Sequence, residues 1–377
     1  MIFNEMQELI RKSAKAFAEK EIAPIAAQID ENEEVPVELF NKIAKNNYMG
    51  ITIPKKYGGA GAGYVAMAIV MEELAKKCAS TTLLITSPNS LLGLPILNFG
   101  TEEQKRKYLT PVVTGKIQGT FALTEPGACS DAASIKTTAA KDGDSYILNG
   151  RKTFITAATV ADYAIVFAVT DTAKGLKGIT AFFVESNTKG YSVGKKERKM
   201  GVTGSPTADI ILDNVRVHKD NILGKESEGF IMAMKTLDSG RLIVAAQSLG
   251  IAQAAMDEAV KYVKEREQFG KSLSKFQGIQ FMLADMETKI NCVRALIYDV
   301  AQKKDNGLNI SNEAAMAKYY ASETAFEVAS KALQLHGGYG YMKDYPIERI
   351  FRNSRVTTIY EGTSQILQTV IAKNLFK

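Results

Sequence analysis

The chain carries one isolated carboxylate in a setting that suits acid–base chemistry. It lies near the C-terminus, in the segment Ile359-Tyr360-Glu361-Gly362-Thr363-Ser364-Gln365-Ile366. An apolar environment raises the pKa of a carboxyl group, so Glu361 could act as a base that takes a proton that water cannot. The alternative is an ordinary carboxylate at a helix terminus, where it interacts with the helix dipole. The choice between them depends on the rest of the chain.

Composition excludes several classes of protein. The chain has 377 residues, 46% hydrophobic and 23% charged, which is typical of a globular protein with two or three domains. No apolar run is long enough to cross a bilayer and the first residues lack a signal-peptide pattern, so we expect a cytoplasmic protein without membrane insertion. The net charge is +6, and the basic residues are interspersed with acidic ones along the chain. This pattern predicts no surface for binding nucleic acid.

The residues that commonly bind metals are few and scattered. Cys78, Cys129 and Cys292 are far apart in the sequence, and His218 and His336 are the two histidines. None of them has the spacing of a metal-ligand pair, so no metal site is predicted. The thiols instead fit a reducing compartment.

Three segments with different patterns follow one another. Residues 1–117 are predicted to form an N-terminal α-helical domain, because apolar residues recur there at helical spacing. Residues 118–223 are predicted to form a middle antiparallel β domain, and residues 224–377 a C-terminal domain resembling a four-helix bundle. The predicted fold class is therefore α+β and multidomain. The β-prone runs of the middle segment are 120–123, 146–148, 163–167, 179–184 and 210–212.

Apolar residues in the last segment recur at alternating steps of four and three. This spacing predicts a long helix that packs in a bundle core or against another subunit. Ser311 is expected to cap the next helix, Gly337-Gly338 to end it, and Thr363 to cap the last helix. The spaced residues are Ile279, Leu283, Met286, Ile290, Val293, Ile297 and Val300.

Five motifs occur in order along the chain. They are Phe121-Ala122-Leu123-Thr124-Glu125-Pro126-Gly127-Ala128-Cys129-Ser130-Asp131, Lys152-Thr153-Phe154-Ile155-Thr156, Leu237-Asp238-Ser239-Gly240-Arg241, Arg266-Glu267-Gln268-Phe269-Gly270 with Phe276-Gln277, and Gln334-Leu335-His336-Gly337-Gly338-Tyr339-Gly340 leading to the Glu361 segment. Each alone could arise by chance, whereas five in order form a strong signal. Together they resemble the acyl-CoA dehydrogenase family over essentially the whole chain, and most of all its short-chain, butyryl-CoA type.

The resemblance implies an FAD site built from distant parts of the chain. The positions that match contacts around the flavin ring are Phe121, Leu123, Thr124, Ser130, Phe154 and Thr156. Those that match contacts to the pyrophosphate and adenosine of a neighbouring subunit's cofactor are Arg266, Phe269 and Gln277. Arginine suits that role because it presents a planar set of donors to phosphate. Further matching FAD contacts are Gln334, Gly337, Gly338, Thr363 and Gln365.

The resemblance also implies the substrate contacts and the chemistry. The matching positions of the acyl-CoA pocket are Ser130, Asp238, Arg241 and Gly362. Glu361 matches the catalytic base, which removes the α proton of an acyl thioester while a hydride passes from the β carbon to flavin N5. One branch of the family carries its base just before the arginine of the third motif. That position is Gly240 here, which excludes the alternative.

Some positions depart from the family pattern. Many relatives have Trp at the position of Phe154, and this chain contains no Trp. Cys129 stands where relatives usually have Gly, and we expect it to be a small buried residue. Thr156-Ala157-Ala158 and Asn353-Ser354 also differ from the commoner residues. His336 is expected to pack or lie at the surface, without a catalytic role.

Three functions fit these observations. The first is FAD-dependent dehydrogenation of a short-chain acyl-CoA to a trans-2-enoyl-CoA, by a homotetramer (a dimer of dimers) that passes electrons to an electron-transferring flavoprotein. The second is the reverse reaction, reduction of an enoyl-CoA or aryl-acryloyl-CoA, which the departures at Phe154 and 156–158 leave open. The third is a catalytically silent scaffold, against which intact Glu361, Arg266 and Thr124 argue.

The resemblance further suggests which residues close the acyl pocket. Met71, Leu74, Leu242 and Ile243 are the candidates, and all are larger than Ala or Gly. Extra methylenes in a filled site cost about 1–3 kcal/mol. We therefore expect a short or compact acyl group, of about four to six carbons.

Overall fold

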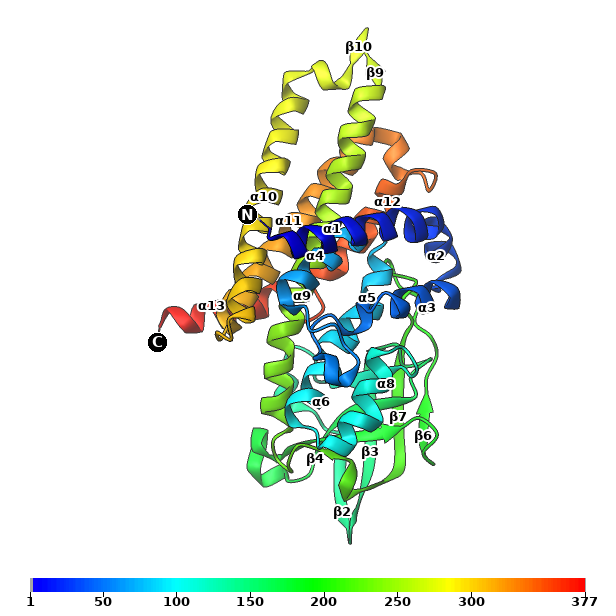
Figure 1. The fold of residues 1–377 in the computed structure, drawn as a ribbon, viewed down its shortest axis with the longest axis vertical. Helices are drawn as coiled ribbons and strands as arrows, with labels where there is room; N and C mark the ends of the chain where they lie inside the picture. The colour runs from blue at the N-terminus through cyan, green and yellow to red at the C-terminus, as the bar shows by residue number, and fades with distance from the viewer. Residues whose placement is uncertain (1–2, 377) are drawn as a thin grey trace.

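Helices from the two ends of the chain lie side by side, and the middle of the chain forms a β-sheet at one end of an elongated molecule (Figure 1). The computed structural model describes residues 3–376. Within that part of the chain, no helix is long and apolar enough to span a membrane.

Short helices connected by tight turns make up the N-terminal segment, as predicted. Among them, α4 lies at the centre and is buried from Val65 to Ala75, so it packs against neighbours on every side. Its N-terminus is capped from a distance by Asp305, whose carboxylate accepts hydrogen bonds from Tyr64 N at 2.6 Å and Val65 N at 3.0 Å. The helices are α1 (Glu5–Phe17), α2 (Ala26–Asn32), α3 (Val37–Lys45), α4 (Gly63–Ala75), α5 (Ala79–Asn89), α6 (Gly93–Phe99), α7 (Glu102–Gln104) and α8 (Thr110–Val113).

Eight strands of the middle segment form one sheet. Seven of them follow the order β6-β7-β3-β2-β4-β5-β8, and β1 pairs with β4. Every predicted β-prone run lies within or overlaps a strand of this sheet. The strands are β1 (Gly119–Ala122), β2 (Thr138–Asp142), β3 (Ser145–Thr156), β4 (Tyr163–Val169), β5 (Ile179–Glu185), β6 (Tyr191–Val193), β7 (Thr207–His218) and β8 (Ile222–Leu223).

The sheet is mixed, whereas the sequence predicted antiparallel pairing throughout. β1 runs parallel to β4, with Gly119 opposite Tyr163, and β2 makes one parallel pair with β4. The cause is the β2–β3 hairpin, which lies between β1 and β4 in sequence, so the chain returns to β1 by a crossover rather than by a tight turn. β4 is buried on both faces, which explains why its sequence is continuously apolar and does not alternate.

Long helices form the C-terminal segment. The apolar seam predicted for residues 279–300 lies along α10, and five of its residues, from Met286 to Val300, are buried in the core shared with α4, α9 and α11. The helices are α9 (Gly229–Glu265), α10 (Gln277–Asp305), α11 (Ser311–His336), α12 (Pro346–Thr357) and α13 (Ser364–Leu375). A hairpin of β9 (Glu267–Gln268) and β10 (Lys271–Ser272) joins α9 to α10 at the far tip of the molecule (Figure 1).

Two of the three predicted helix boundaries are confirmed. Gly337 ends α11 with φ of 58°, and the Thr363 side chain accepts a hydrogen bond from Ile366 N at 3.3 Å to cap α13. The predicted cap at Ser311 is wrong, because Ser311 is already inside α11. Asn309 instead accepts the hydrogen bond from Ser311 N at 3.1 Å, so the local side-chain partner comes two residues earlier.

Candidate active site

Glu361 lies on a strained turn between α12 and α13. Its φ is 56°, in the left-handed region that costs an L-residue about 1 kcal/mol, and the next residue, Gly362, has φ of 104°. Phe154 and Phe269 also have left-handed backbones, with φ of 57° and 54°. Three non-glycine residues predicted for the site therefore carry backbone strain, which is common where a fold holds a side chain for a function.

Neighbouring helices hold this turn from several sides. Lys318 Nζ, from α11, donates a hydrogen bond of 2.7 Å to the carbonyl oxygen of Gly362, and Arg241 Nε, from α9, approaches the carbonyl oxygen of Glu361 at 3.4 Å. The Ser364 hydroxyl donates to the Glu323 carboxylate. The backbone around Glu361 is thus fixed by charged side chains of two long helices.

The Glu361 carboxylate lies directly against α9 at Gly240. A Cβ atom added to Gly240 would lie 2.7 Å from Oε2 of Glu361 and 3.1 Å from Oε1. The residue as a whole keeps some exposure, but its Oε2 atom is buried and accepts no hydrogen bond within the described residues. Burial raises the pKa of Glu361 to about 7, against the opposing effects of Arg241 and Lys318.

Two of the predicted substrate contacts form a pair beside this carboxylate. Arg241 Nη1 and Asp238 Oδ1 are 2.8 Å apart on α9, and Arg241 is buried. Arg241 also reaches Glu361 and Gly362, so these predicted positions lie together, and their contact with substrate stays a prediction. Ser130 is different: it is exposed on the loop after β1, and no hydrogen bond joins it to these three residues.

A buried polar chain next to Glu361 was not predicted from the sequence. The Tyr360 hydroxyl contacts Gln247 Oε1 on α9, and Gln247 Nε2 donates to Thr82 Oγ1 on α5 at 2.8 Å. Burial raises the pKa of Tyr360 far above its usual range, so its hydroxyl stays protonated. A signal was available: Gln247 is seven residues after Gly240, which places both on the same face of one helix.

Lys318 was also missed by the sequence interpretation. It is buried with Ala314, Ala321 and Ala325, which lie at helical spacing on the same face of α11. A single lysine on an otherwise alanine-lined face is unusual for a buried helix. That pattern was readable in the sequence, but its partner, the carbonyl oxygen of Gly362, is 44 residues away.

The residues predicted to surround the flavin ring meet where β1 and β3 end. The Thr120 hydroxyl donates to the Thr156 carbonyl oxygen at 2.6 Å, and Thr153 N donates to the Thr124 carbonyl oxygen at 2.9 Å. The pairing of β3 with β7 shifts register at Thr153 and Phe154, and the Phe154 side chain is 65% exposed. Such a bulge redirects a side chain out of the sheet. Phe121 lies at the adjoining end of β1, and Leu123 follows directly after the strand.

A buried ion pair ties these two strand ends together. Lys152 Nζ lies 2.7 Å from Glu125 Oε1 and 3.1 Å from the Leu123 carbonyl oxygen, and both charged side chains are buried. Burial lowers the pKa of Lys152 to about 8. The other oxygen of Glu125 accepts from Lys136 N at 2.6 Å, so this carboxylate also fixes the loop that carries Ser130.

The third predicted group lies at the opposite end of the molecule. Phe269, 92% exposed, stands at the tip of the β9–β10 hairpin, and Gln277 begins α10 nearby. The Arg266 guanidinium lies over the Tyr339 ring at 5.6 Å, which brings the hairpin next to Gly337 and Gly338. Gln334, at the end of α11, belongs to the same region, whereas Gln365 lies in the first turn of α13 beside Thr363. The hairpin group does not meet the strand ends of the sheet within one chain (Figure 1).

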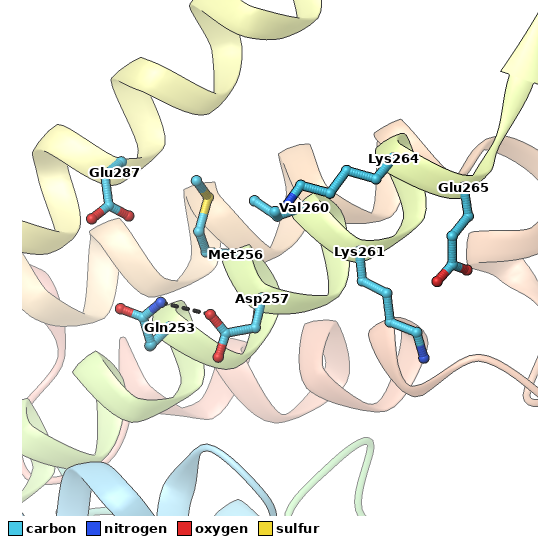
Figure 2. A pocket seen from close by; sticks show the side chains of 8 residues that line it. All are labelled: Gln253, Met256, Asp257, Val260, Lys261, Lys264, Glu265 and Glu287. Carbon is cyan, nitrogen blue, oxygen red and sulfur yellow. Dashed lines mark hydrogen bonds between the residues drawn. The ribbon is translucent and has the colours of Figure 1, made fainter. Parts of the chain in front are cut away.

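An open groove of about 450 Å³ lies between α9 and α10, and it contains none of the predicted site residues. Figure 2 shows acidic and basic side chains of this groove together with the apolar Met256 and Val260, and Gln253 Nε2 donates to Asp257 Oδ1 at 2.8 Å. The lining residues are Gln253, Met256, Asp257, Val260, Lys261, Lys264, Glu265 and Glu287.

The cysteines and histidines form no metal site within residues 3–376, where no cluster of three or more metal-binding side chains occurs. His336 is buried and stacks on Tyr262 with a ring separation of 4.2 Å, so the predicted packing role is confirmed. The expectation of a buried Cys129 is wrong: it is exposed, because the turn that carries it projects beyond the end of β1.

The chain matches three family models in succession. They describe the N-terminal domain of acyl-CoA dehydrogenase at residues 4–116, the middle domain at 120–215 and the C-terminal domain at 227–376. Members of this family are flavin-dependent oxidoreductases that act on acyl-CoA esters, and they bind FAD.

Relatives match over the full length of the chain. A 3-(aryl)acrylate reductase of Clostridium sporogenes is 57% identical and the CarC subunit of the caffeyl-CoA reductase-Etf complex of Acetobacterium woodii is 52% identical, with all of each chain covered. A short-chain specific acyl-CoA dehydrogenase of Clostridium acetobutylicum is 47% identical over 98% of both chains. Butyryl-CoA dehydrogenase of Megasphaera elsdenii has a structure with a TM-score of 0.97 at 44% identity, covering all of both chains. The chain therefore belongs to the acyl-CoA dehydrogenase family.

Proposed function

We propose that this protein interconverts an acyl-CoA and its trans-2-enoyl-CoA, and that Glu361 carries the α proton. The observation that supports this most is the Glu361 carboxylate itself, buried at Oε2, held on a strained turn and seated against Gly240. With a pKa raised to about 7, the group is about half protonated at neutral pH. It can therefore take the α proton from an acyl ester or return it to an enoyl ester.

The strand ends of the middle segment fit the flavin of FAD. Phe154 has an exposed aromatic side chain on a left-handed backbone and lies two residues before Thr156. The buried ion pair between Lys152 and Glu125 makes this surface rigid. Space is open beside Gly127, where a Cβ would meet no atom within 4 Å. The bound flavin supplies two-electron chemistry at the β carbon. We propose that Phe121, Leu123, Thr124, Ser130, Phe154 and Thr156 hold its ring.

We propose that the working enzyme is a homotetramer in which the hairpin tip of one chain reaches the cofactor of another. Arg266, Phe269 and Gln277 lie far from the strand ends of their own chain, and Phe269 is almost fully exposed. Covering this side chain with a partner subunit would remove its apolar surface from water, which favours association. The guanidinium of Arg266 lies over the Tyr339 ring. This contact orients the N–H donors of Arg266 and leaves its positive charge available for a phosphate group.

Two directions of the reaction remain as candidates, and we favour reduction of an aryl-acryloyl-CoA. The relatives at 57% and 52% identity are named for reduction of aryl-acrylic substrates. Dehydrogenation of a short-chain acyl-CoA is the second candidate, supported by the relative at 47% identity and by the structural likeness to butyryl-CoA dehydrogenase. This second candidate is further supported by the burial of the side chains expected to close the acyl pocket, which favours a compact acyl group. They are Met71, Leu74, Leu242 and Ile243.

The electron partner that we propose is an electron-transferring flavoprotein. One relative is a subunit of a reductase-Etf complex. A chain of the structure reported for the electron transferring flavoprotein of Acidaminococcus fermentans has a TM-score of 0.97 at 48% identity, with all of both chains covered.

An anoxic flavin titration tests the proposed function. The purified yellow enzyme is mixed with butyryl-CoA, and the dithionite-reduced enzyme is mixed separately with cinnamoyl-CoA or crotonyl-CoA. Bleaching by butyryl-CoA supports dehydrogenation, whereas faster reoxidation by cinnamoyl-CoA than by crotonyl-CoA supports aryl-acryloyl reduction. A flavin that responds to none of these esters would contradict both candidates.

A further inference from the structure

Lys318 is a buried cation that the proposed chemistry has not yet used. The residue lies in the first third of α11 and is 0% exposed, and its Nζ donates one hydrogen bond of 2.7 Å to the carbonyl oxygen of Gly362. Within the described residues, no carboxylate forms an ion pair with it. A buried ammonium with a single acceptor is costly unless another charge compensates it.

The charged groups around this ammonium leave one carboxylate without a partner. On α9, Arg241 is paired with Asp238 at 2.8 Å. On α11, Glu323 accepts a hydrogen bond from the start of α13. Tyr360 stays neutral because burial raises its pKa. Glu361, whose buried oxygen has no hydrogen-bond donor among the described residues, is the group that remains to balance the buried positive charge.

We propose that Lys318 is a positioning residue for the reaction: it holds the turn at Gly362 in place and supplies the buried counter-charge of the Glu361 carboxylate. This inference rests on the proposed function, because it concerns the same proton transfer. The hydrogen bond to Gly362 acts on the residue that follows the base, so it fixes the backbone beside Glu361 and holds the ammonium close to that residue.

The titration of the two groups supports this pairing. Burial lowers the pKa of Lys318 to about 7, while Glu361 works in the opposite direction. Burial raises the pKa of Glu361 to about 7, and Arg241 and Lys318 both counteract it. The two groups are therefore coupled: the ionised carboxylate of Glu361 favours the protonated form of Lys318, and the two protons leave in separate steps that belong to the pair.

Replacing Lys318 by methionine tests the counter-charge. Removing a nearby positive charge destabilises the carboxylate, so the pKa of Glu361 rises. We expect the pH at half-maximal rate of flavin bleaching by butyryl-CoA to move upward by about one unit or more in the Lys318→Met holoenzyme. Lys318→Arg, which keeps the charge, should shift much less. If cinnamoyl-CoA reduction is the reaction observed, the alkaline limb of its profile moves upward by the same amount.

A matched control separates this effect from loss of any lysine of α11. Lys331 is also on α11 and pairs with Asp285 and Glu327 near the surface, so Lys331→Met should leave the pH profile unchanged. An unaltered profile in Lys318→Met, even with lower thermal stability, would overturn the inference. Glu361→Gln tests the proposed function separately: normal flavin reduction in that variant would refute the base, whatever Lys318 does.

A thermodynamic cycle provides a second measurement that needs no turnover. Thermal unfolding is compared for the holoenzyme, Lys318→Arg, Lys318→Met, Glu361→Gln and the Lys318→Met/Glu361→Gln double variant. If the charges compensate each other, the double variant loses less stability than the two single variants predict together. Strict additivity would overturn the inference. If Lys318→Met does not accumulate alone but the double variant does, that rescue itself supports the pairing. If neither accumulates, Lys318→Gln, which removes the charge and keeps a donor for the Gly362 carbonyl oxygen, replaces Lys318→Met, and an unaltered pH profile in that variant would overturn the inference.

Discussion

A Cβ atom at Gly240 would lie 2.7 Å from Oε2 of Glu361, closer than unbonded carbon and oxygen atoms approach in proteins. The base and the helix that faces it are therefore complementary: one position carries the carboxylate and the other has no side chain. This explains physically why a base cannot be placed at both positions. The position that the Glu361 carboxylate can occupy therefore depends on a single residue of α9, Gly240.

Replacing Gly240 by alanine should displace the base without removing it. The added methyl group must push the carboxylate away, and misplacing a catalytic group by about 1 Å costs about 100-fold in rate. We expect that loss in the rate of flavin bleaching, with FAD retained. Ser248→Ala introduces the same residue elsewhere on α9 and should keep full activity. A Gly240→Ala enzyme with the normal rate would show that the carboxylate acts from another position.

The pH dependence should reveal the direction of the reaction and the role of Glu361. The pKa of this group is raised to about 7, so dehydrogenation, which needs the ionised form, should accelerate as pH rises through about 7. Reduction needs the protonated form and should slow over the same range. Glu361→Gln should keep FAD and bind acyl-CoA but lose about 1,000-fold in rate, because the amide accepts no proton. Stopped-flow flavin absorbance measures each limb, and a rate independent of pH from 5 to 9 would contradict the assignment.

Local sequence signals predicted much of the fold. The apolar spacing along residues 279–300 identified a helix that packs in the core, and the Thr363 side chain caps α13 because capping depends on a few adjacent residues. The family resemblance selected Asp238, Arg241 and Gly362, and hydrogen bonds of Arg241 bring it next to Asp238 and to the backbone of Glu361, while their role in binding substrate stays a prediction. The fold class could be predicted because each of these signals is short-range or carried by a motif.

The remainder depends on contacts between distant segments. The parallel pairing of β1 with β4 is set by a crossover that leaves no mark on either strand. The Lys318 contact with Gly362, and the chain from Tyr360 through Gln247, join helices that are far apart in sequence. The exposure of Cys129 depends on where its loop ends in space. Lys318 and Gln247 can be recognised in the sequence as polar residues on helix faces, but neither segment identifies the distant partner.

Replacing Arg266 by alanine should weaken cofactor retention and assembly together. In the proposed tetramer this side chain reaches a cofactor held mainly by another chain, and a ligand that binds only the assembled state stabilises that state. We expect a lower ratio of flavin to protein absorbance and smaller species in sedimentation velocity. Arg216→Ala, which removes an exposed charge from β7 on the sheet, serves as the control. A variant that remains fully yellow and tetrameric would refute the proposed contact.

The ion pair between Lys152 and Glu125 should be important for stability because both side chains are buried. Glu125→Gln leaves an unpaired lysine and should cost about 3 kcal/mol, with earlier release of flavin on heating. Replacing both residues, as Glu125→Leu with Lys152→Met, should recover much of that loss, since no buried charge then remains. Equal thermal midpoints for the single and double variants would show that the pair adds no coupling.

The size of the acyl group should follow the packing around α4 and α9. Met71, Leu74, Leu242 and Ile243 are buried with at most 1% exposure, which leaves little room for a long chain if they close the pocket. Since one methylene in a filled pocket costs about 1–3 kcal/mol, kcat/KM should fall at least tenfold from butyryl-CoA to octanoyl-CoA and further for palmitoyl-CoA. Leu242→Ala should reduce the difference in kcat/KM between butyryl-CoA and octanoyl-CoA. Val293→Ala, in the same core but on α10, should leave that difference unchanged. A preference for octanoyl-CoA would refute the short pocket and leave the family assignment intact. A higher rate of reduction for cinnamoyl-CoA than for crotonyl-CoA would identify a pocket that is short but wide enough for an aromatic ring.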